Sequence, residues 1–490
     1  MSKILLINPS KWGRGITPIW AASHAGILKS SKHNVQFFDS TFYKNWTNNE
    51  VKFNTENKQY RPSNYFNKIK FKNQNVKEDL KNVLNEFEPD IIFWSAISSH
   101  IHGEGEYVNV QYGYELIENL KIDNALIITG GLQATASPEK IFENYKNINF
   151  IIKGESEKVL LECANKIDSK NYSKKEKVNI IKSIKGISYI ENSILKSNER
   201  QEIISNLDTI GMYDYSIFED QIFLRPYNGD VIKAVDYELS RGCVFTCSYC
   251  VETIIQKYYG FEENKRGVLT NAKSYIRNKS AKRIFDEFKD LSKKFKINLI
   301  RCQDTNFLTI NRDVLKELAE LMKGEKLNVK LYIETRPEGI NEFTVSLLQN
   351  LNVDGVGMGL EVSSEGFREE SLNRYANQNK IRSAFKLLRE KNIKRTAYNI
   401  IGLPNQTEEM IKETIKFNQE LKPDNITVAY YSPYYGTIEQ KKSEITGDFQ
   451  NYEQNVDGQL RSLSKSNLLS VSKLDYYKKN FYNLVYGEKN

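Results

Sequence analysis

The chain has 490 residues, 40% of them hydrophobic and 27% charged, which is ordinary for a globular protein of two or three domains. Its net charge of +8 is scattered among acidic residues, so we expect no nucleic-acid stripe, in which basic residues would cluster. No apolar run reaches the roughly 18 residues of a membrane span, so we expect no membrane association. Five cysteines, three of them within eight residues, favour a reducing, cytoplasmic setting over a disulfide framework.

Short apolar runs alternate with helical stretches over the first 165 residues. We predict strands at residues 4–7, 35–39, 90–95, 125–131 and 150–155. Near-continuous apolar strands are typical of a parallel sheet covered by helices on both faces. We therefore predict a doubly wound α/β domain over residues 1–165, which begins with a strand and not with a signal peptide.

Small and polar residues follow several of these strands. They include Asn8, Pro9, Ser95, Ser99, Gly130, Gly131, Gly154 and Glu155. Ligands of open parallel sheets bind beyond the carboxyl ends of the strands. Since small side chains let a large planar ligand approach the backbone, we expect a ligand-binding edge here.

Two segments lack this alternation. Residues 41–75 are rich in Asn, Lys and Tyr, and we interpret them as an insertion or long loop. Residues 166–229 are mostly polar, with one hairpin expected near Gly186. We predict that they form a linker between two domains.

A second strand–helix alternation runs from about residue 230 to residue 440. Its predicted strands are residues 235–239, 298–301, 330–334, 355–361, 396–401 and 425–430, with helices such as 313–322 and 408–421 between them. Six such units indicate a partial (β/α)6 barrel, whose chemistry should lie at the carboxyl ends of its strands. Residues 441–490 are expected to be a helical C-terminal region.

Cys243, Cys247 and Cys250 form a C-x3-C-x2-C motif directly after a predicted strand. Cubane iron–sulfur clusters are held by thiolates, and three close ligands leave one iron open to a small molecule. A structural zinc site would require a closed set of four ligands. Only Cys163 and Cys302 remain among the cysteines, and all four histidines precede residue 103. We therefore expect these three cysteines to hold a [4Fe–4S] cluster as metal ligands and catalytic residues, and we keep zinc as the weaker alternative.

The cysteine motif, with Tyr249 before its last cysteine, resembles the signature of the radical S-adenosylmethionine superfamily. The resemblance implies that the open iron binds S-adenosylmethionine, which one-electron reduction cleaves to a 5′-deoxyadenosyl radical. It also implies an electron donor such as flavodoxin or ferredoxin. In this family the cofactor supplies the difficult chemistry, and the protein orients it and excludes water.

Later segments resemble further motifs of the superfamily in the expected order. The resemblance implies that S-adenosylmethionine is bound by Tyr249, Asp304, Asn306, Arg336, Glu361, Ser363, Ile401 and Gly402. Glu361 would bind the ribose or amino group, and the segment with Ile401 would pack on adenine. The family's glycine-rich form of the motif around Asp304 is absent. Taken singly, a strand-end Glu is more often the partner of a salt bridge than a ligand.

Segments 130–139 and 153–157 resemble the cobalamin-binding domain that precedes the radical domain in one large subfamily. The resemblance adds Gln133 to the expected cobalamin contacts. No Asp-x-His-x-x-Gly motif is present, because neither His100 nor His102 has an Asp two residues earlier. The alternative is a nucleotide-like fold that binds nothing or binds the substrate itself. We expect His24, His100 and His102 to be core or rim residues.

The resemblance implies a cobalamin-dependent enzyme that methylates an unactivated carbon of a small molecule or natural-product intermediate. The alternative is cyclisation, rearrangement or oxidation within the same subfamily, without use of methylcobalamin. A methylthiotransferase is disfavoured because those enzymes need three further cysteines. A ligand- or nucleic-acid-binding module with a vestigial barrel is disfavoured by the intact cysteine motif and the scattered charge.

Overall fold

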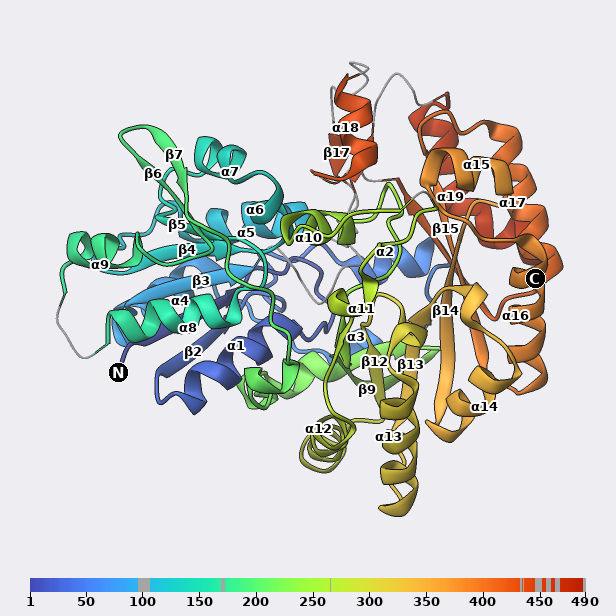
Figure 1. Ribbon diagram of the computed structural model, residues 1–490, viewed down its shortest axis with the longest axis horizontal. Coiled ribbons are helices and arrows are strands. Elements are labelled where there is room, and N and C mark those ends of the chain that lie inside the picture. The colour runs from blue at the N-terminus through green and yellow to red at the C-terminus, as the bar shows by residue number, and fades with distance from the viewer. Residues whose placement is uncertain are drawn as a thin grey trace. The chain divides into compact units, whose positions relative to one another are not determined.

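The computed structural model describes residues 1–95, 106–168, 172–264, 266–431, 434, 436–445, 452–454, 460–462 and 468–487. The chain divides into two units (Figure 1). Unit 1 comprises Met1–Asn49, Phe66–Leu224 and Ile254–Gly260, and unit 2 comprises Glu50–Tyr65, Arg225–Thr253 and Phe261–Asn490. None of the helices within these described ranges has both the length and the hydrophobicity needed to span a bilayer.

Unit 1 is built on a sheet with the strand order β2-β1-β3-β4-β5-β6-β7. The strands are β1 Lys3–Asn8, β2 Asn34–Asp39, β3 Ile91–Ser95, β4 Leu126–Gly130, β5 Phe150–Ile152, β6 Ile187–Glu191 and β7 Ile194–Ser197. The helices are α1 Ile19–Ser30, α4 Val76–Phe87, α5 Glu106–Ile117, α6 Leu132–Ala136, α7 Pro138–Asn144, α8 Glu157–Lys166 and α9 Lys174–Ile181, with 3-10 turns η1 Leu207–Ile210, η2 Tyr215–Ile217 and η3 Asp220–Phe223. Strands β1 to β5 are parallel, which confirms the predicted parallel sheet.

The sheet of unit 1 is doubly wound. The chain leaves β1 toward β2 in one direction and leaves β3 toward β4 and β5 in the other. Because β–α–β crossovers are right-handed, the two directions place α1 and α5 on opposite faces. The order of the strands therefore reverses between β1 and β3, and ligands of such sheets bind at the carboxyl end of that reversal.

The predicted linker contributes to the sheet of unit 1. Helix α9 and the hairpin β6–β7 lie within it, and β6 pairs antiparallel with β5 through Ile152 and Ile187. Ser173 caps α9, since its hydroxyl accepts a hydrogen bond from Glu176 N while the Glu176 side chain binds the Ser173 backbone. Such a capping box satisfies backbone donors that the first turn of a helix leaves open.

Unit 2 contains a seven-stranded sheet with the order β16-β15-β14-β13-β12-β9-β8. Its strands are β8 Leu224–Tyr227, β9 Asp230–Tyr237, β12 Leu299–Cys302, β13 Lys330–Thr335, β14 Val353–Glu361, β15 Lys394–Ile401 and β16 Asn425–Tyr430. Short pairs are β10 Ser240–Arg241 with β11 Arg277–Asn278, and β17 Tyr452–Gln454 with β18 Leu460–Ser462. The pairings from β9 to β16 are parallel, so the six predicted strands form the expected open, partial barrel.

Helices cover the outer face of this sheet (Figure 1). The helices of unit 2 are α2 Glu50–Glu56, α11 Ala272–Tyr275, α12 Ala281–Lys294, α13 Arg312–Gly324, α14 Glu342–Asn350, α15 Glu365–Leu372, α16 Gln378–Glu390, α17 Glu408–Leu421, α18 Ile438–Ile445 and α19 Val471–Tyr486, with 3-10 turns η4 Phe307–Thr309 and η5 Pro337–Gly339. Helices α3 Tyr65–Lys68 and α10 Glu252–Tyr258 are divided between the units. Ser280, Asn311, Asn377, Thr407 and Ser470 cap α12, α13, α16, α17 and α19 by accepting backbone N–H hydrogen bonds, which stabilises helix starts.

Residues 41–75, which we interpreted as an insertion or long loop, contain the short helices α2 and α3 and are therefore not a loop throughout. In unit 2, the backbone N–H of Val428 on the edge strand β16 donates to Gln59 Oε1 at 3.0 Å. Lys58 Nζ donates to Asn483 Oδ1 on α19 at 2.6 Å. This part of the segment therefore satisfies a donor of the edge strand that would otherwise be open to pairing with another chain.

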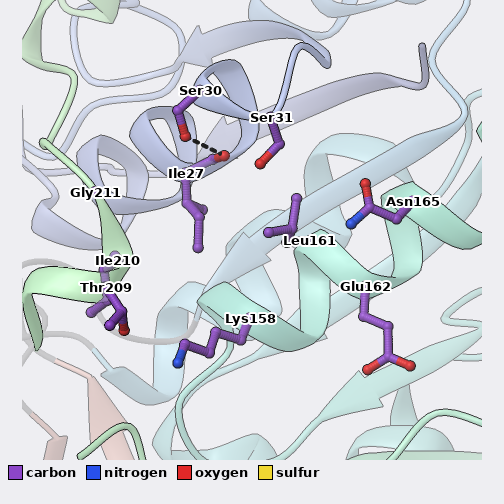
Figure 2. Close-up of a pocket in the computed structure, with 10 residues that line it drawn as sticks. All are labelled: Ile27, Ser30, Ser31, Lys158, Leu161, Glu162, Asn165, Thr209, Ile210 and Gly211. Atoms are coloured by element: carbon purple, nitrogen blue, oxygen red, sulfur yellow. Dashed lines mark hydrogen bonds between the residues drawn. The ribbon is translucent and has the colours of Figure 1, made fainter. Parts of the chain in front are cut away.

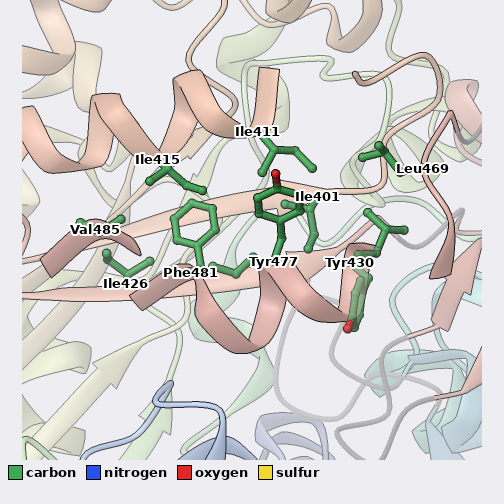
Figure 3. Close-up of a cluster of buried hydrophobic side chains, with 11 residues drawn as sticks. Ile401, Ile411, Ile415, Ile426, Tyr430, Leu469, Tyr477, Phe481 and Val485 are labelled. Atoms are coloured by element: carbon green, nitrogen blue, oxygen red, sulfur yellow. The ribbon is translucent and has the colours of Figure 1, made fainter. Parts of the chain in front are cut away.

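A hydrophobic cluster joins α19 to the edge of the partial barrel (Figure 3). The cluster consists of Ile401, Ile411, Ile415, Ile426, Val428, Tyr430, Leu469, Leu474, Tyr477, Phe481 and Val485. These side chains come from β15, β16, α17, α19 and Leu469, which lies two residues before α19. Within the expected helical C-terminal region, α19 is a helix whose apolar side packs beside β16. The strands β17 and β18 lie in the same region, so it is not helical throughout.

Phe481 tests how much this contact stabilises unit 2. Its side chain is fully buried in the cluster, so we expect Phe481→Ala to lower the free energy of unfolding by about 3–5 kcal/mol through lost burial and the cavity left behind. Chemical denaturation followed by circular dichroism measures the change. Tyr476→Ala on the same helix is the control, since Tyr476 is 53% exposed. Equal effects of both changes would contradict the packing described here.

Candidate functional site

The three motif cysteines lie in a loop after β9 and β10. Backbone contacts with other segments hold this loop in place before and between the cysteines. Gly242 adopts φ +100°, and a Cβ there would lie 2.5 Å from the carbonyl oxygen of Tyr275, so only glycine fits. The backbone of Thr246 donates to Gly267 O at 3.0 Å, and that of Ser248 donates to Leu372 O at 3.0 Å. The cysteine positions therefore depend on segments far along the chain.

Cys243 and Cys247 are buried, and Cys250 is partly buried. Burial, together with the negative charge of Glu252, raises the pKa of the Cys243 thiol to about 12. Burial also raises the pKa of Cys250. A thiolate at such a position needs nearby positive charge, and metal binding supplies this while it displaces the proton.

The cysteine loop offers three thiolates close together in the chain, Cys243, Cys247 and Cys250. A mononuclear zinc site needs its four ligands around a single centre. A cubane instead binds each thiolate through a different iron, so its ligands are spread around the cluster. The cysteine loop therefore suits a [4Fe–4S] cluster.

Tyr249 and Glu361 meet beside the cysteine loop. The hydroxyl of Tyr249 donates to Glu361 Oε1 at 2.9 Å, and Arg374 Nη1 lies 3.7 Å from the same oxygen. Glu361 has φ +59° at a register shift in β14, and such irregularities redirect a side chain at a sheet edge. A Cβ at Gly359 would lie 2.2 Å from Glu361 Oε1, so this glycine makes room for the carboxylate.

Arg336, at the end of β13, contacts the cysteine loop directly. Its Nη1 atom donates to Cys247 Sγ at 3.6 Å. Its guanidinium lies 3.7 Å from the centre of the Phe245 ring and also binds Glu338. The structure thus brings Tyr249, Arg336 and Glu361 together around the motif cysteines.

Asp304 and Asn306 support this site through hydrogen bonds to other strand ends. Asp304 Oδ1 accepts hydrogen bonds from Leu239 N at 3.1 Å and from both Ser240 N and Ser240 Oγ at 2.6 Å. Asn306 Oδ1 accepts hydrogen bonds from the Thr335 hydroxyl at 2.6 Å and from the backbone of Arg336 at 3.4 Å. Asp304 therefore anchors the strand end that leads into the cysteine loop, and Asn306 joins the ends of β12 and β13.

Ser363 and Ile401 point toward the helices. The backbone N–H of Ser363 donates to Thr414 Oγ1 on α17 at 3.0 Å, and the two hydroxyls lie 3.4 Å apart. The Ile401 side chain belongs to the outer hydrophobic cluster (Figure 3). It is therefore not placed to pack on adenine, whereas we expected the segment with Ile401 to do so. Gly402 has φ +79°, and its N–H donates to Gln406 Oε1 at 2.7 Å. At Ile401, only the backbone is left for a cofactor.

Several residues of this site were missed by sequence reasoning. Arg374 and Glu338 have no local motif, because they reach the site only through the fold. Phe245 lies within the cysteine motif itself, but its contact with Arg336 also depends on the fold. Ile400 packs in a cluster with Tyr249, whereas Ile401 does not. The alternation of side chains along a strand was the signal that could have separated these two neighbours.

Most of the residues expected to bind cobalamin form one row at the carboxyl edge of unit 1. Ser95 pairs with Gly130, and β1, which ends at Asn8 beside the buried Pro9, pairs with β3. Asn8 Nδ2 donates to Asp39 Oδ1 at 3.0 Å. Ser99, His100 and His102 lie outside the described residues.

Gln133 carries the observation that most favours a ligand at this edge. It lies in α6 after Gly131, whose φ is +104°. Its Oε1 atom is buried and has no hydrogen-bond partner among the described residues. Because a buried amide oxygen without a donor is costly, a bound group that donates a hydrogen bond fits this position.

Gly154 and Glu155 are occupied by contacts within unit 1. A Cβ at Gly154 would lie 2.5 Å from the Tyr259 hydroxyl, which accepts a hydrogen bond from Glu155 N at 2.9 Å. Glu155 Oε2 accepts one from Ile204 N at 3.0 Å. These contacts account for the glycine at position 154 without a cofactor.

The described histidines have structural roles, as expected for His24. His24 stacks on Phe93 at 5.1 Å, with its ring nitrogens 2.6 Å from Trp20 O and 2.9 Å from Ser156 Oγ. His33 precedes β2, and its Nε2 lies 2.9 Å from Asn165 Oδ1. Neither side chain is available as a cobalt ligand at the carboxyl edge.

Unit 1 also has a surface pocket between α1, α8 and η1 (Figure 2). It is lined by Ile27, Ser30, Ser31, Lys158, Leu161, Glu162, Asn165, Thr209, Ile210 and Gly211. Helix α1 begins near the carboxyl end of β1 and runs back along the sheet. Ser30 and Ser31 lie at its far end, near the amino ends of the strands. The pocket therefore lies away from the expected cofactor edge.

Comparison with known proteins identifies the class. Residues 237–417 match the model of the Radical SAM superfamily, so this segment of unit 2 is a radical SAM domain. Such a domain implies a [4Fe–4S] cluster and S-adenosylmethionine as the cofactors of unit 2, in agreement with the cysteine loop.

Two curated relatives cover 73% of this chain. One is the anaerobic magnesium-protoporphyrin IX monomethyl ester cyclase of Cereibacter sphaeroides, 24% identical over 53% of its own length. The other is an uncharacterized methyltransferase of Pyrococcus horikoshii, 24% identical over 70% of its length. The chain thus spans about half of the cyclase.

Two solved structures share the fold of nearly the whole chain. The radical S-adenosylmethionine methyltransferase TsrM from Kitasatospora setae covers 93% of it, with a TM-score of 0.65, 16% identity and 79% of TsrM matched. The cobalamin-dependent radical enzyme OxsB covers 98%, with a TM-score of 0.63, 15% identity and 67% of OxsB matched. Both units therefore have the fold of cobalamin-dependent radical S-adenosylmethionine enzymes.

Asp304 provides a test of how the cysteine loop is anchored. A buried donor left without an acceptor costs about 1–3 kcal/mol, so we expect Asp304→Ala to lower the free energy of unfolding by at least about 2 kcal/mol. Asp304→Asn keeps an acceptor oxygen, so we expect it to lower the free energy of unfolding by less than Asp304→Ala does. Burial raises the pKa of Asp304 from 3.8 to about 7, so the folded state binds this proton more tightly than the unfolded state.

The stability contributed by Asp304 should therefore fall as pH rises from about 4 to about 7. Over this interval the stability of Asp304→Asn should rise relative to that of the unmodified protein, as measured by urea denaturation at several pH values. A constant difference between the two proteins would refute the raised pKa.

Proposed function

We propose that this chain is a cobalamin-dependent radical S-adenosylmethionine enzyme that methylates an unactivated carbon of a small molecule or natural-product intermediate. The observation that carries the proposal is the combination of the cysteine loop in unit 2 with a doubly wound sheet in unit 1. TsrM, a methyltransferase whose structure was solved with cobalamin and a [4Fe–4S] cluster, shares this combination over 92% of the chain.

In unit 2, Cys243, Cys247 and Cys250 would hold the cluster. When bound, the cluster and S-adenosylmethionine supply radical chemistry that no protein side chain provides. Glu361, oriented by Tyr249 and Arg374, is placed to accept hydrogen bonds from the amino or ribose groups of S-adenosylmethionine. The neighbouring segments bury these groups, which excludes water from a reactive site.

The remaining unit 2 residues act as supports in this proposal. Asp304 and Asn306 position the strand ends, Ser363 fixes the segment after Glu361 against α17, and the backbone at Ile401 and Gly402 lines the adenine side. We place the radical domain at residues 230–440 and the helical C-terminal region at 441–490.

In unit 1, the carboxyl edge would hold cobalamin, which supplies a methyl carrier when bound. We assign the contacts to Asn8, Pro9, Ser95, Ser99, Gly130, Gly131 and Gln133, and with less structural support to Gly154 and Glu155. The cobalamin domain would comprise residues 1–165, and residues 166–229 would lead to the radical domain after they add the β6–β7 hairpin to the sheet of unit 1. Since His24 and His33 are held by other contacts, cobalt would receive no ligand from these two side chains.

A second candidate is cyclisation, rearrangement or oxidation without methylcobalamin. It is favoured by the cyclase of Cereibacter sphaeroides, which matches this chain as well as the methyltransferase relative does. Both candidates require a small-molecule substrate and an electron donor such as flavodoxin or ferredoxin.

The cluster assignment predicts the metal content of the protein. After anaerobic reconstitution, the chain should contain about four irons with the spectrum of a cubane cluster. Changing Cys243, Cys247 or Cys250 to Ala should abolish assembly, whereas Cys163→Ala should not, because Cys163 is buried in α8 of unit 1. Reductive cleavage of S-adenosylmethionine by the triple-Ala protein would refute the assignment.

The products of S-adenosylmethionine separate the two candidates without knowledge of the substrate. With cobalamin and a reductant, a methyltransferase should form S-adenosylhomocysteine as well as 5′-deoxyadenosine, both measurable by mass spectrometry. Cobalamin should remain bound through gel filtration, and Gln133→Ala should weaken its retention. Retention of no cobalamin by the full chain, with 5′-deoxyadenosine as the sole product, would favour the second candidate.

A further inference from the structure

Arg336 is held in one orientation by four groups. Its Nε atom donates to Glu338 Oε1 at 3.0 Å, and its Nη2 atom donates to the carbonyl oxygen of Tyr375 at 3.4 Å. The central carbon of the guanidinium lies 3.7 Å from the centre of the Phe245 ring. The fourth group is Cys247, whose sulfur accepts the hydrogen bond from Nη1.

These contacts engage all three nitrogens of the guanidinium, and only one of them involves a motif cysteine. A planar guanidinium has a fixed fork of donors, so its orientation toward Glu338 determines where Nη1 points. Only 9% of the Arg336 side chain and 16% of the Glu338 side chain are exposed. In such surroundings a charge acts on its neighbours more strongly than it would in water.

We propose that Arg336 raises the reduction potential of the cluster bound through Cys247, and that Glu338 limits this effect. The proposal rests on the proposed function only in that a [4Fe–4S] cluster must bind the three cysteines. Arg336 acts through Cys247 and is a positioning residue.

The physical reason is the charge that reduction adds. One electron passes from the donor, a flavodoxin or ferredoxin, to the cluster, and no bond to the protein changes. Cluster potentials depend on net charge, on hydrogen bonds to the sulfurs and on solvent exposure. A hydrogen-bonded cation beside Cys247 stabilises the more negative, reduced form.

Glu338 opposes the cation because it shares the same guanidinium. The positive charges of Arg336 and Arg374 hold the pKa of the Glu338 carboxyl below its usual range. The Arg336 charge also favours the thiolate of Cys243, although burial has the larger effect there. Substitution of Arg336 and substitution of Glu338 should therefore shift the reduction potential of the cluster in opposite directions.

The test measures the midpoint potential of the reconstituted full chain by anaerobic titration, with the reduced cluster followed by electron paramagnetic resonance. We expect Arg336→Gln to make reduction about tenfold less favourable, a shift of about 59 mV to lower potential for one electron. Glu338→Gln should shift the potential upward, and Arg336→Lys should fall between Arg336→Gln and the unmodified protein. Iron content is measured on every sample.

The outcomes separate this inference from the proposed function. If the unmodified chain assembles no cubane cluster, the proposed function fails. If Arg336→Gln has full iron content and an unchanged or higher potential, the inference fails alone. Should Arg336→Gln lose the cluster, Glu338→Gln decides, and an unchanged or lower potential there overturns the inference. A purely structural role for Arg336 would not produce shifts of opposite sign.

Discussion

The buried thiols of the cysteine loop are the constraint on which the rest of this site depends. Burial raises the pKa of the Cys243 and Cys250 thiols, and a metal cluster removes that penalty because it binds the deprotonated sulfurs. The loop must therefore be held before the cluster arrives. Gly242, the backbone hydrogen bonds of Thr246 and Ser248, and the anchor at Asp304 supply this preorganisation.

Charge at the cysteine loop is arranged in pairs. Arg336 lies between Cys247 and Glu338, and Arg374 lies close to Glu361, which also binds Tyr249. Buried charges are tolerated when each has a partner of opposite sign, whereas removal of one partner is costly. Arg336 therefore links the sulfur of Cys247 to the Glu338 carboxylate, and Glu361 links Arg374 to the Tyr249 hydroxyl.

Both units follow the rule that parallel sheets bind ligands at the carboxyl ends of their strands. In unit 2 the rule brings together Tyr249, Arg336 and Glu361. In unit 1 it places Asn8, Ser95 and Gly130 on adjacent strands. The helix that follows Gly130 carries Gln133, whose Oε1 atom has no hydrogen-bond partner among the described residues. The residues at Gly154 and Glu155 share the edge but are used by Tyr259 and Ile204.

The sequence by itself determined the two parallel sheets, the partial barrel, the cysteine motif and the superfamily, because strand periodicity and ligand spacing are local properties. It did not determine the helices within residues 41–75 or the contribution of the predicted linker to the first sheet. Nor did it show that Ile401 faces the helices or that Arg374 and Glu338 reach the site. Those features arise from contacts between residues far apart in the chain, such as Arg336 with Cys247. Only tertiary structure brings such groups together, so only it decided the charges that surround the cysteines.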